Sequence, residues 1–378
     1  MKKRIRLFAM ILCMCQLLSL MGCGGQPAET TVPPENSAPA ESLAETIETP
    51  TTLPTFPEEV SKVIPWGAEG PIAEQAKNSG EMIICFMSGE GTKISGSTSQ
   101  TAFSDTKWGD SSLIAFPNGE IMLIDGGMAD YGPLLVENLH ALGVERIDYL
   151  VLSHRHDDHY GGLLRNDGVM DSFPVGVVYT SGAYNGRASD PLRLEGKCSE
   201  LNIPHEVLRQ GDVLSIGEVT MEVLWPNPEV IGTYHPTTEA TNNGSLVLRF
   251  EYGEISALFA GDLYVGAEAE LMNAVDPAKL DADILKMPHH GRSTSNSKGF
   301  AKAVSPQIAA ATGAIIMETS IYTNYARLGT RVFMDVYDGY LMVRTDGVNL
   351  RWKSSRVRDV PAYDKLDNAF DIDRNSPE

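Results

Sequence analysis

The chain has 378 residues and a formal net charge of −20, because 50 acidic residues outnumber 30 basic ones. A strongly acidic protein is repelled by polyanions over long distances, which counts against tight, non-specific binding of nucleic acid. Three of the five cysteines lie in the N-terminal segment, and the two that remain, Cys85 and Cys198, are too few for a cysteine-rich zinc site. Length alone would allow two domains, but the composition of the two ends leaves only part of the chain able to fold.

The N-terminus combines a basic start with an apolar stretch from about Leu7 to Met21, which is typical of a secretory signal. The letters LMGC at 20–23 resemble the lipobox of bacterial lipoproteins, where cleavage leaves a lipidated cysteine. We therefore expect a signal peptide over 1–22, lipidation of Cys23, and a membrane-anchored protein facing outside the cytoplasm. An uncleaved N-terminal anchor is the alternative. Cleavage would remove four basic residues and change the net charge to about −24.

The next segment, 23–57, is rich in Pro, Glu, Thr, Ser and Ala. Such a composition buries too little apolar surface to offset the entropy of ordering, so it predicts a disordered tether. A lead-in over 58–78 would precede a folded domain over 79–355. The acidic tail over 356–378 is expected to be flexible.

Short apolar runs separated by turn residues begin near Gly80 and predict strands. Segments with helical periodicity lie between some of them. This alternation predicts one α/β domain. The expected strands are MIICFM (82–87), SSLIAF (111–116), IMLIDGG (121–127), DYLVLSH (148–154), VGVVYTSG (175–182), TMEVLWP (220–226), SLVLRFEY (245–252), SALFAGD (256–262), ADILKMPHHG (282–291), IAAATGA (308–314) and LMVRTDG (341–347), and the expected helices are YGPLLVENLHALG (131–143), GAEAELMNAV (266–275) and GFAKAVSP (299–306).

Three of the eight histidines and two aspartates fall within HRHDDH, residues 154–159, directly behind an apolar run. A solvated charged loop is the alternative interpretation. However, so many ionisable groups packed behind a buried strand need a compensating cation. Imidazole with carboxylate is the ligand set of zinc and neighbouring metals, so the cluster predicts a metal site.

Further polar residues follow other apolar runs, namely Asp125, Asp262 and His289. Loops at the ends of strands are where folds usually build active sites. We therefore expect these residues to converge with the histidine cluster.

The pattern His154-x-His156-x-Asp158-His159 resembles the signature of the metallo-β-lactamase superfamily. The blocks GDSSLIAFPNGEIMLIDGG, NNGSLVLRFEYGEISALFAGD and DILKMPHHGRSTS are similar to those of its competence-related branch, the ComEC C-terminal-domain-like hydrolases. The resemblance covers most of residues 80–350 and implies a single-domain, four-layer αββα sandwich. It also implies that His154 and His156 bind a first metal, and that Asp158 and His159 bind a second.

Four more positions take their expected roles from the same resemblance. Asp262 matches the bridging carboxylate and His289 the final histidine of the family. His290 remains open as the ligand instead, with His289 favoured because neighbouring side chains on a strand point to opposite faces. Asp125 would orient a ligand without touching metal; the alternative for it is an ordinary turn aspartate before two glycines.

One block departs from the pattern of the superfamily. Thr241, Asn242 and Asn243 stand where another histidine is common, and Asn243 is expected beside the ligands. An amide oxygen is a poorer zinc ligand than imidazole and suits manganese better. His235 is an alternative substitute from upstream. The expected cofactors are therefore two divalent metal ions, zinc or manganese, with occupancy of both positions left open.

The chemistry implied is metal-dependent hydrolysis. Bound cations lower the pKa of water towards neutrality, so that a metal-bound hydroxide attacks, while Asp158 or Asp262 accepts a proton. Nucleases and phosphodiesterases fill the closest branches, so we expect a phosphodiester-type bond in a small molecule or the cell envelope as the substrate. An extracellular DNA nuclease is the first alternative, and a catalytically inactive surface binding lipoprotein is the second. No protein partner is inferred.

For some residues we expect no role in the site, and for others the sequence leaves the role undecided. Asp110 of GDSS is expected to be a strand-entry turn rather than part of the site. Arg187 is expected on the surface, with contact to an anionic group as its alternative. The insertion over 92–107 could cover the site. Whether Cys85 and Cys198 form a disulfide is left undecided.

Overall fold

The computed structural model describes Trp66 and residues 69–89, 108–183, 193–227, 237–313 and 317–355. The predicted signal, the tether and the C-terminal tail lie outside these residues, as do Arg187, His235 and the insertion over 92–107. None of the helices in the described ranges combines the length and apolarity needed to cross a membrane.

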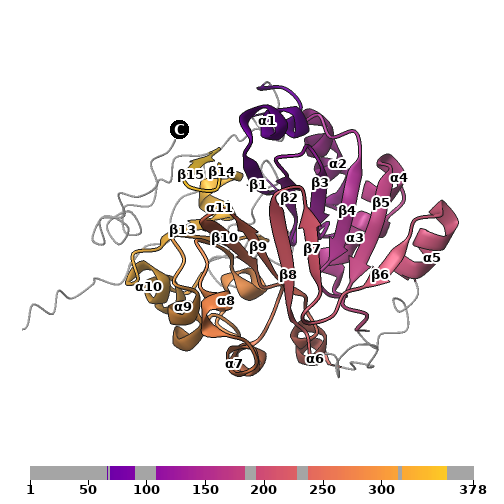
Figure 1. Ribbon diagram of the computed structural model, residues 1–378. Coiled ribbons are helices and arrows are strands. Elements are labelled where there is room, and N and C mark those ends of the chain that lie inside the picture. Colours follow the sequence, from indigo (N-terminus) through magenta and orange to yellow (C-terminus); the bar gives the residue numbers. More distant parts are fainter. Residues whose placement is uncertain are drawn as a thin grey trace, which may run out of the picture. The chain divides into compact units, whose positions relative to one another are not determined.

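The strands form two sheets, one of eight strands and one of seven (Figure 1). The first has the order β15-β14-β1-β2-β3-β4-β5-β6 and the second the order β13-β12-β11-β10-β9-β8-β7. Their bounds are β1 Met82–Phe86, β2 Ser112–Ala115, β3 Ile121–Ile124, β4 Ile147–Leu152, β5 Val175–Thr180, β6 His205–Val207, β7 Val213–Ile216, β8 Val219–Trp225, β9 Val247–Tyr252, β10 Ile255–Phe259, β11 Ile284–Lys286, β12 Ile308–Ala311, β13 Arg331–Met334, β14 Leu341–Thr345 and β15 Leu350–Ser354.

Helices cover the outer faces of the two sheets (Figure 1). With the two sheets between them, they complete the predicted four-layer αββα sandwich. The helices are α1 Ile72–Ser79, α2 Gly132–Ala141, α3 Asp157–Leu164, α4 Val169–Ser172, α5 Arg193–Leu201, α6 Thr238–Asn243, α7 Val265–Ala274, α8 Pro277–Leu280, the 3-10 helix η4 Pro288–Gly291, α9 Lys298–Val304, α10 Thr319–Ala326 and α11 Asp335–Asp338.

Each sheet is antiparallel in one half and parallel in the other. In the first sheet β3, β4, β5 and β6 run parallel, and in the second sheet β10, β11, β12 and β13 run parallel. Parallel strands present their carboxyl ends at one edge of a sheet, where ligand sites are commonly built. The polar residues singled out in the sequence follow β3, β4, β10 and β11, so both sheets deliver them to such an edge.

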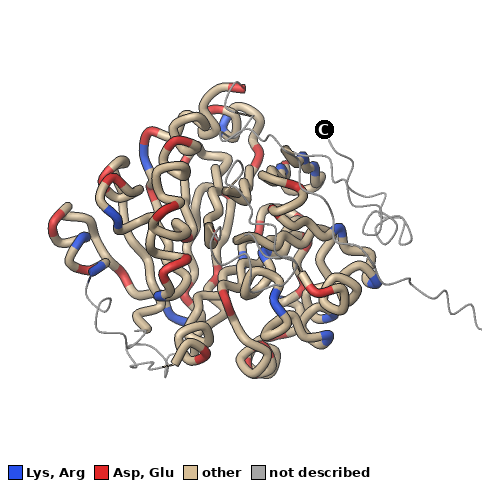
Figure 2. The backbone as a smooth tube through the Cα atoms, turned by 180° about the vertical axis from the view of Figure 1, so that it is seen from behind, with Lys and Arg blue, Asp and Glu red and all other residues tan. Residues whose placement is uncertain are grey.

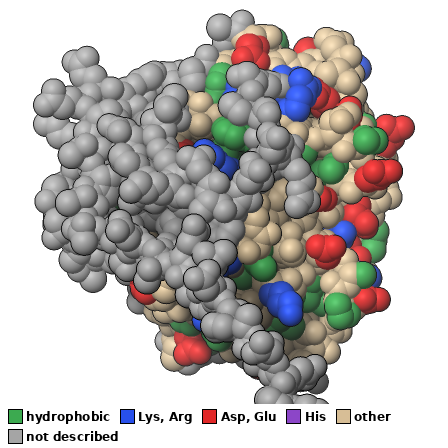
Figure 3. Space-filling view, turned by 90° about the vertical axis from the view of Figure 1, so that its left-hand side faces the viewer, with side chains coloured by type: hydrophobic (Ala, Val, Ile, Leu, Met, Phe, Trp, Pro, Cys, Tyr) green, Lys and Arg blue, Asp and Glu red, His purple; other side chains and the backbone are tan. Residues whose placement is uncertain are grey.

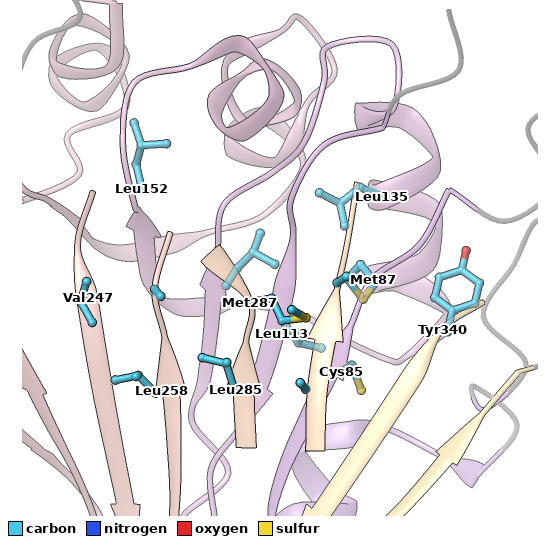
Figure 4. Close-up of a cluster of buried hydrophobic side chains, with 14 of the residues drawn as sticks. Cys85, Met87, Leu113, Leu135, Leu152, Val247, Leu258, Leu285, Met287 and Tyr340 are labelled. Atoms are coloured by element: carbon cyan, nitrogen blue, oxygen red, sulfur yellow. The ribbon is translucent and has the colours of Figure 1, made fainter. Parts of the chain in front are cut away.

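Alternation along the strands divides the core in two. In β1, Ile84 belongs to the cluster between the sheets, whereas Ile83 and Cys85 belong to the cluster beneath the helices. Figure 4 shows part of the cluster beneath the helices, in which Cys85 of β1, Leu113 of β2 and Met87 lie close together. Both faces of the central strands are therefore covered, which explains their nearly unbroken apolar runs.

Helix α1 falls inside the segment 58–78 that was predicted as a lead-in, apart from its last residue, Ser79. Its Ile72 and Ala76 are fully buried in the core. Its end is marked by Gly80, whose left-handed backbone is a common helix stop. Cys85 and Cys198 are both free and buried, so no disulfide joins them.

Charged residues of both signs are spread along the chain, as Figure 2 shows from behind. On the uncovered part of the face in Figure 3, acidic, basic and hydrophobic side chains alternate and no histidine is visible. That uncovered part presents no single-sign field of the kind that attracts a polyanion.

Candidate metal centre

Asp125, directly after β3, holds two neighbouring elements of the site. Its backbone has a φ of 61°, and its carboxylate accepts hydrogen bonds from the Ser153 backbone at 2.7 Å and hydroxyl at 2.6 Å. The same carboxylate accepts a bond of 2.8 Å from Nδ1 of His159. With Nδ1 engaged in this way, Nε2 of His159 is turned toward the centre of the site.

Asp158 and His159 lie on the first turn of helix α3, not on a loop as the sequence pattern suggested. The backbone of this helix is fastened to the Asp125 loop. Gly126 donates to the His159 carbonyl at 2.7 Å, and Gly162 donates to the Gly127 carbonyl at 2.9 Å. A Cβ on Gly162 would lie 2.1 Å from the Gly126 carbonyl oxygen, so the two backbones approach too closely for any larger residue.

Asp262, after β10, is the point on which the histidines converge. Its Oδ2 atom lies 3.3 Å from Nε2 of His159 and 3.4 Å from Nε2 of His290. The Nε2 atoms of His154 and His289 are each 3.8 Å from the same oxygen. Four imidazoles contributed by widely separated parts of the chain therefore surround one carboxylate oxygen.

His156 and Asp158 complete the set predicted from the sequence. Nδ1 of His156 lies 3.0 Å from Nε2 of His154, and Oδ2 of Asp158 lies 3.4 Å from Nε2 of His290. All the residues of the predicted metal set are thus brought together.

His289 and His290 are not on a strand, so the alternation argument used to choose between them was wrong. Both lie in the 3-10 turn η4 with left-handed backbones, at φ 48° and 57°. The buried member of the pair is His290, with none of its side chain exposed, against 13% for His289. Gly313 leaves the room for it, because a Cβ there would lie 2.6 Å from His290 Nδ1.

The charges in this cluster are strongly coupled. Burial would raise the pKa of Asp262, but the surrounding imidazoles of His290 and His159 lower it well below its usual value. For His154, burial and the positive charge of His159 lower the pKa well below its usual value. A neutral imidazole at His154 and an ionised carboxylate at Asp262 are the forms that bind metals.

The donor atoms fit a divalent cation. Groups of three ligand atoms within 4.8 Å of one another include His154, His159 and Asp262, and also Asp158, His159 and His290. Among the described residues, Nε2 of His159 and Nε2 of His290 are buried without a hydrogen-bond partner. Buried polar atoms are normally hydrogen-bonded. Two unpaired nitrogen atoms at one point are therefore expected if these atoms bind cations.

The Asn-rich block occupies helix α6 and the turn after it. The side chain of Asn243 accepts a hydrogen bond of 3.2 Å from the Tyr264 backbone, so its polar group serves the fold near the site. Asn242 is fully buried, and neither amide atom has a partner of normal geometry among the described residues. Burial raises the pKa of Tyr264 and the Asn242 amide partly offsets this, so these two side chains are neighbours.

Two buried groups were missed by the sequence reading. Lys286, the last residue of β11, forms a close ion pair with Asp110, whose other oxygen accepts from Thr312. Asp110 is therefore not a simple turn residue, since its Oδ2 also lies 3.8 Å from Nδ1 of His290. The available signal was a lysine within the apolar run ILKMP, where a strand buried on both faces would not tolerate an unpaired charge.

The sequence of the domain matches a known family. Residues 109–310 match the sequence family described as the metallo-beta-lactamase superfamily. The chain belongs to the metallo-beta-lactamase superfamily, and its fold and site are those of a metallohydrolase.

Among the curated relatives, ComE operon protein 3 of Bacillus subtilis (strain 168) is 30% identical over 226 residues, which are 54% of this chain and 27% of that protein. Competence protein ComA of Neisseria gonorrhoeae is 30% identical over 214 residues, or 55% and 26%. The chain thus spans about a quarter of the length of these relatives. Among solved structures, the metallo-beta-lactamase fold protein YhfI of Bacillus subtilis has a TM-score of 0.43 at 14% identity, covering 67% of this chain and 95% of that one.

Proposed function

We propose that this chain hydrolyses a phosphodiester-type bond with the help of two divalent metal ions, and that it does so outside the cytoplasm. The observation that carries the proposal is the ring of four imidazole Nε2 atoms within 3.8 Å of one Asp262 oxygen. A buried carboxylate in such a position is suited to bridge two cations.

The ligands divide into two sets around Asp262. His154 and His156 would hold the first ion, and Asp158 with His159 the second. We favour His290 over His289 as the remaining ligand of the second ion, because its Nε2 lies 3.4 Å from both Asp158 and Asp262. When bound, such ions supply a nucleophile from water at neutral pH and polarise the bond to be cleaved.

Asp158 is the better candidate for accepting the proton of the attacking water. Its side chain is 12% exposed, whereas that of Asp262 is 2% exposed. Solvent or a substrate can therefore reach Asp158, while Asp262 is enclosed by its histidines. A proton acceptor has to be within hydrogen-bond reach of the attacking water.

An anionic substrate is supported by the residues next to His289. The ring of Tyr264 stacks on His289 with centroids 4.9 Å apart. Burial lowers the pKa of His289 to about 3, and the nearby positive charge of Arg292 contributes to this shift. The buried Nε of Arg292 has no hydrogen-bond partner among the described residues. A partly buried guanidinium with spare donors is well suited to a phosphate oxygen.

Zinc and manganese both remain candidates for the ions. Imidazoles favour zinc, whereas the carboxylates of Asp158 and Asp262 also suit manganese. Attachment through a lipid on Cys23 would place the domain at the cell envelope, within reach of small-molecule or cell-envelope phosphodiesters.

Two alternatives follow from specific observations. The resemblance of the sequence blocks to the competence-related branch favours DNA as a second candidate substrate, although the net charge of −20 opposes it. The amides at Asn242 and Asn243, where the superfamily often has a histidine, favour a surface binding lipoprotein without catalysis.

The test uses the purified full-length protein in detergent. Bis-p-nitrophenyl phosphate, DNA and a β-lactam are assayed with zinc, with manganese, and after treatment with a chelator. We expect hydrolysis of the phosphodiester, its loss on chelation and its return with metal. His154→Ala should abolish it, whereas the matched control His205→Ala, which removes an imidazole bonded to Thr180, should not. Activity on the β-lactam alone would contradict the phosphodiester assignment, and a protein that takes up no metal would favour the binding alternative.

A further inference from the structure

Lys286 is a charged side chain in the interior of the second sheet. It ends β11, in which every residue is buried, and only 3% of Lys286 is exposed. Removing an ammonium group from water costs several kcal/mol unless it is paired. The position therefore calls for a compensating role, and the proposed chemistry does not use it.

The ammonium group of Lys286 lies beside the metal centre, close to the carboxylates of Asp110 and Asp262. It pairs with Oδ2 of Asp110, donates to the Gly261 carbonyl at 3.3 Å, and lies 4.0 Å from Oδ1 of Asp262. Asp262 therefore faces Lys286 with one oxygen and the histidines with the other. This arrangement leaves Oδ2 as the oxygen available to ligands.

Asp110 lies beside His290, but less closely than Asp125 lies beside His159. The Asp110 carboxylate is 3.8 Å from Nδ1 of His290, too far for a hydrogen bond, whereas the Asp125 carboxylate accepts a bond of 2.8 Å from Nδ1 of His159. A buried negative charge next to a metal-binding histidine raises the basicity of the ring. A further difference is that Asp110 is also held by Thr312 and Lys286.

Asp110, Asp262 and His290 also bring ligand atoms within 4.8 Å of one another, the spacing of a third cation site. Lys286 already supplies a positive charge to both carboxylates of that group. A third divalent ion would have to displace it from its contact with Asp110, in a place closed to solvent. The ammonium group of Lys286 thus balances the charge of the Asp110 and Asp262 carboxylates, which would otherwise need another cation.

We propose that Lys286 is a built-in cation that holds Asp110 behind His290 and turns Asp262 toward the histidines, so that the centre is shaped for two divalent ions rather than three. Lys286 and Asp110 are then positioning residues and do not touch substrate. The inference rests on the proposed metal site, but it is independent of which bond is hydrolysed.

The experiment measures metal binding by the full-length protein, using cobalt(II) as the probe. Three variants are compared with the wild type: Lys286→Met, Asp110→Asn, and the double variant, which leaves no unpaired buried charge. Lys279→Met is the matched control, because Lys279 pairs with Glu222 on the surface. Affinity and stoichiometry come from competition with a chromophoric chelator, ligand geometry from the visible absorption of cobalt, and folding from the thermal transition of the metal-free protein.

We expect two cobalt ions per wild-type chain. Lys286→Met, Asp110→Asn and the double variant should each weaken one ion by about 10–100-fold, in line with the loss of groups that orient metal ligands, and should alter its absorption. If Lys286→Met does not fold, the double variant and Asp110→Asn carry the comparison.

Wild-type affinity and spectrum in the folded double variant, with only its thermal transition changed, would overturn the inference and reduce Lys286 to a structural ion pair. Three ions bound by the wild type would also overturn it. Failure of the wild type to bind any cobalt would contradict the proposed function itself. This outcome differs from failure of the inference, in which the wild type binds cobalt and the variants bind it equally well.

Discussion

Individual hydrogen bonds decide which atoms of the histidines face the centre. Asp125 engages Nδ1 of His159, and this single contact leaves Nε2 directed at Asp262, 3.3 Å away. Burial alone would lower the pKa of His159, but the carboxylates of Asp262 and Asp125 raise it well above its usual value. Without a cation, this histidine therefore carries a proton that metal binding has to displace.

Replacing Asp125 with Asn tests this orienting contact. Asparagine keeps the shape but lacks the negative charge that strengthens the bond to Nδ1. We expect metal affinity to fall by about 10–100-fold, measured by chelator competition at neutral pH. Asp148→Asn is the control, since Asp148 bonds Arg146 and the backbone of Ile121 away from the site. Equal affinities for Asp125→Asn and the wild type would remove Asp125 from the site.

Metal binding should also depend on pH, with the direction set by the histidines. Because the pKa of His159 is raised well above its usual value, protons compete with the cation through neutral pH. We expect chelator-competition affinity to increase as the pH rises from about 6 to 8, with release of protons on binding. A pH-independent affinity across this range would show that His159 does not bind the ion.

Among single residues, chemistry was easier to predict from the sequence than detailed geometry. His154, His156, Asp158, His159 and Asp262 could be singled out because ligand types crowded behind apolar runs. The choice between His289 and His290 failed, since nothing in the sequence announces two consecutive left-handed residues. Lys286 was overlooked because a lysine has no ligand signature, and its partner Asp110 is 176 positions away.

At the level of elements, helix α3 has to sit against the Asp125 loop for the site to exist. Paired glycines allow this contact, as the Cβ distances at Gly162 indicate. The glycines are evident in the sequence, but their close contact with the backbone of the Asp125 loop could not be predicted, because the two segments are separated along the chain. Strands β6, β7, β13 and β15 were also not predicted, three of them being short and half-exposed with weak apolar patterns.

Gly162→Ala should loosen this helix. The added methyl group would lie 2.1 Å from the Gly126 carbonyl oxygen, so the helix has to shift. We expect a loss of about 1–3 kcal/mol in the free energy of unfolding, the usual cost of overpacking, measured by urea denaturation, together with weaker metal binding. Gly196→Ala is the control, because nothing lies within 4 Å of a Cβ there and alanine is the better helix former. Equal stability of both variants would contradict this packing.

Glu81 joins the start of the domain to its last hairpin. Its carboxylate accepts bonds of 2.8 Å and 3.0 Å from Arg344 of β14 and a close contact from Arg351 of β15. Burial would raise the pKa of Glu81, but the two arginines lower it below its usual 4.5. The pair therefore stabilises the fold fully above about pH 4.5 and loses its contribution as the pH falls through the lowered pKa.

Glu81→Gln should reveal this dependence. Near pH 7 we expect a loss of about 1–3 kcal/mol in the free energy of unfolding, because the variant weakens the hydrogen bonds from two partly exposed arginines. The difference from the wild type should shrink as the pH is lowered toward 3, because the carboxylate of Glu81 gains a proton as the pH falls through its lowered pKa. Urea denaturation at both pH values gives the comparison, and a difference that is constant with pH would contradict the assigned role.

At the scale of the whole molecule, the two sheets together position the residues of the metal site. Each delivers its residues from the carboxyl ends of parallel strands, and the strands of both sheets are held by cores on either side. The sequence predicted this α/β class because central strands leave long apolar runs. It could not assign strands to sheets, since pairing between distant segments leaves no local trace. The first helix was missed because its few apolar residues give a weak pattern outside the folded context.

The central claim is that distant histidines and carboxylates hold divalent ions at one point. Crystals of the protein grown with zinc or manganese, measured at the absorption edge of that metal, test it directly. We predict two anomalous peaks flanking the Asp262 carboxylate, within coordinating distance of His154, His159 and His290. Crystals that contain the metal but show no peak among these residues would contradict the account.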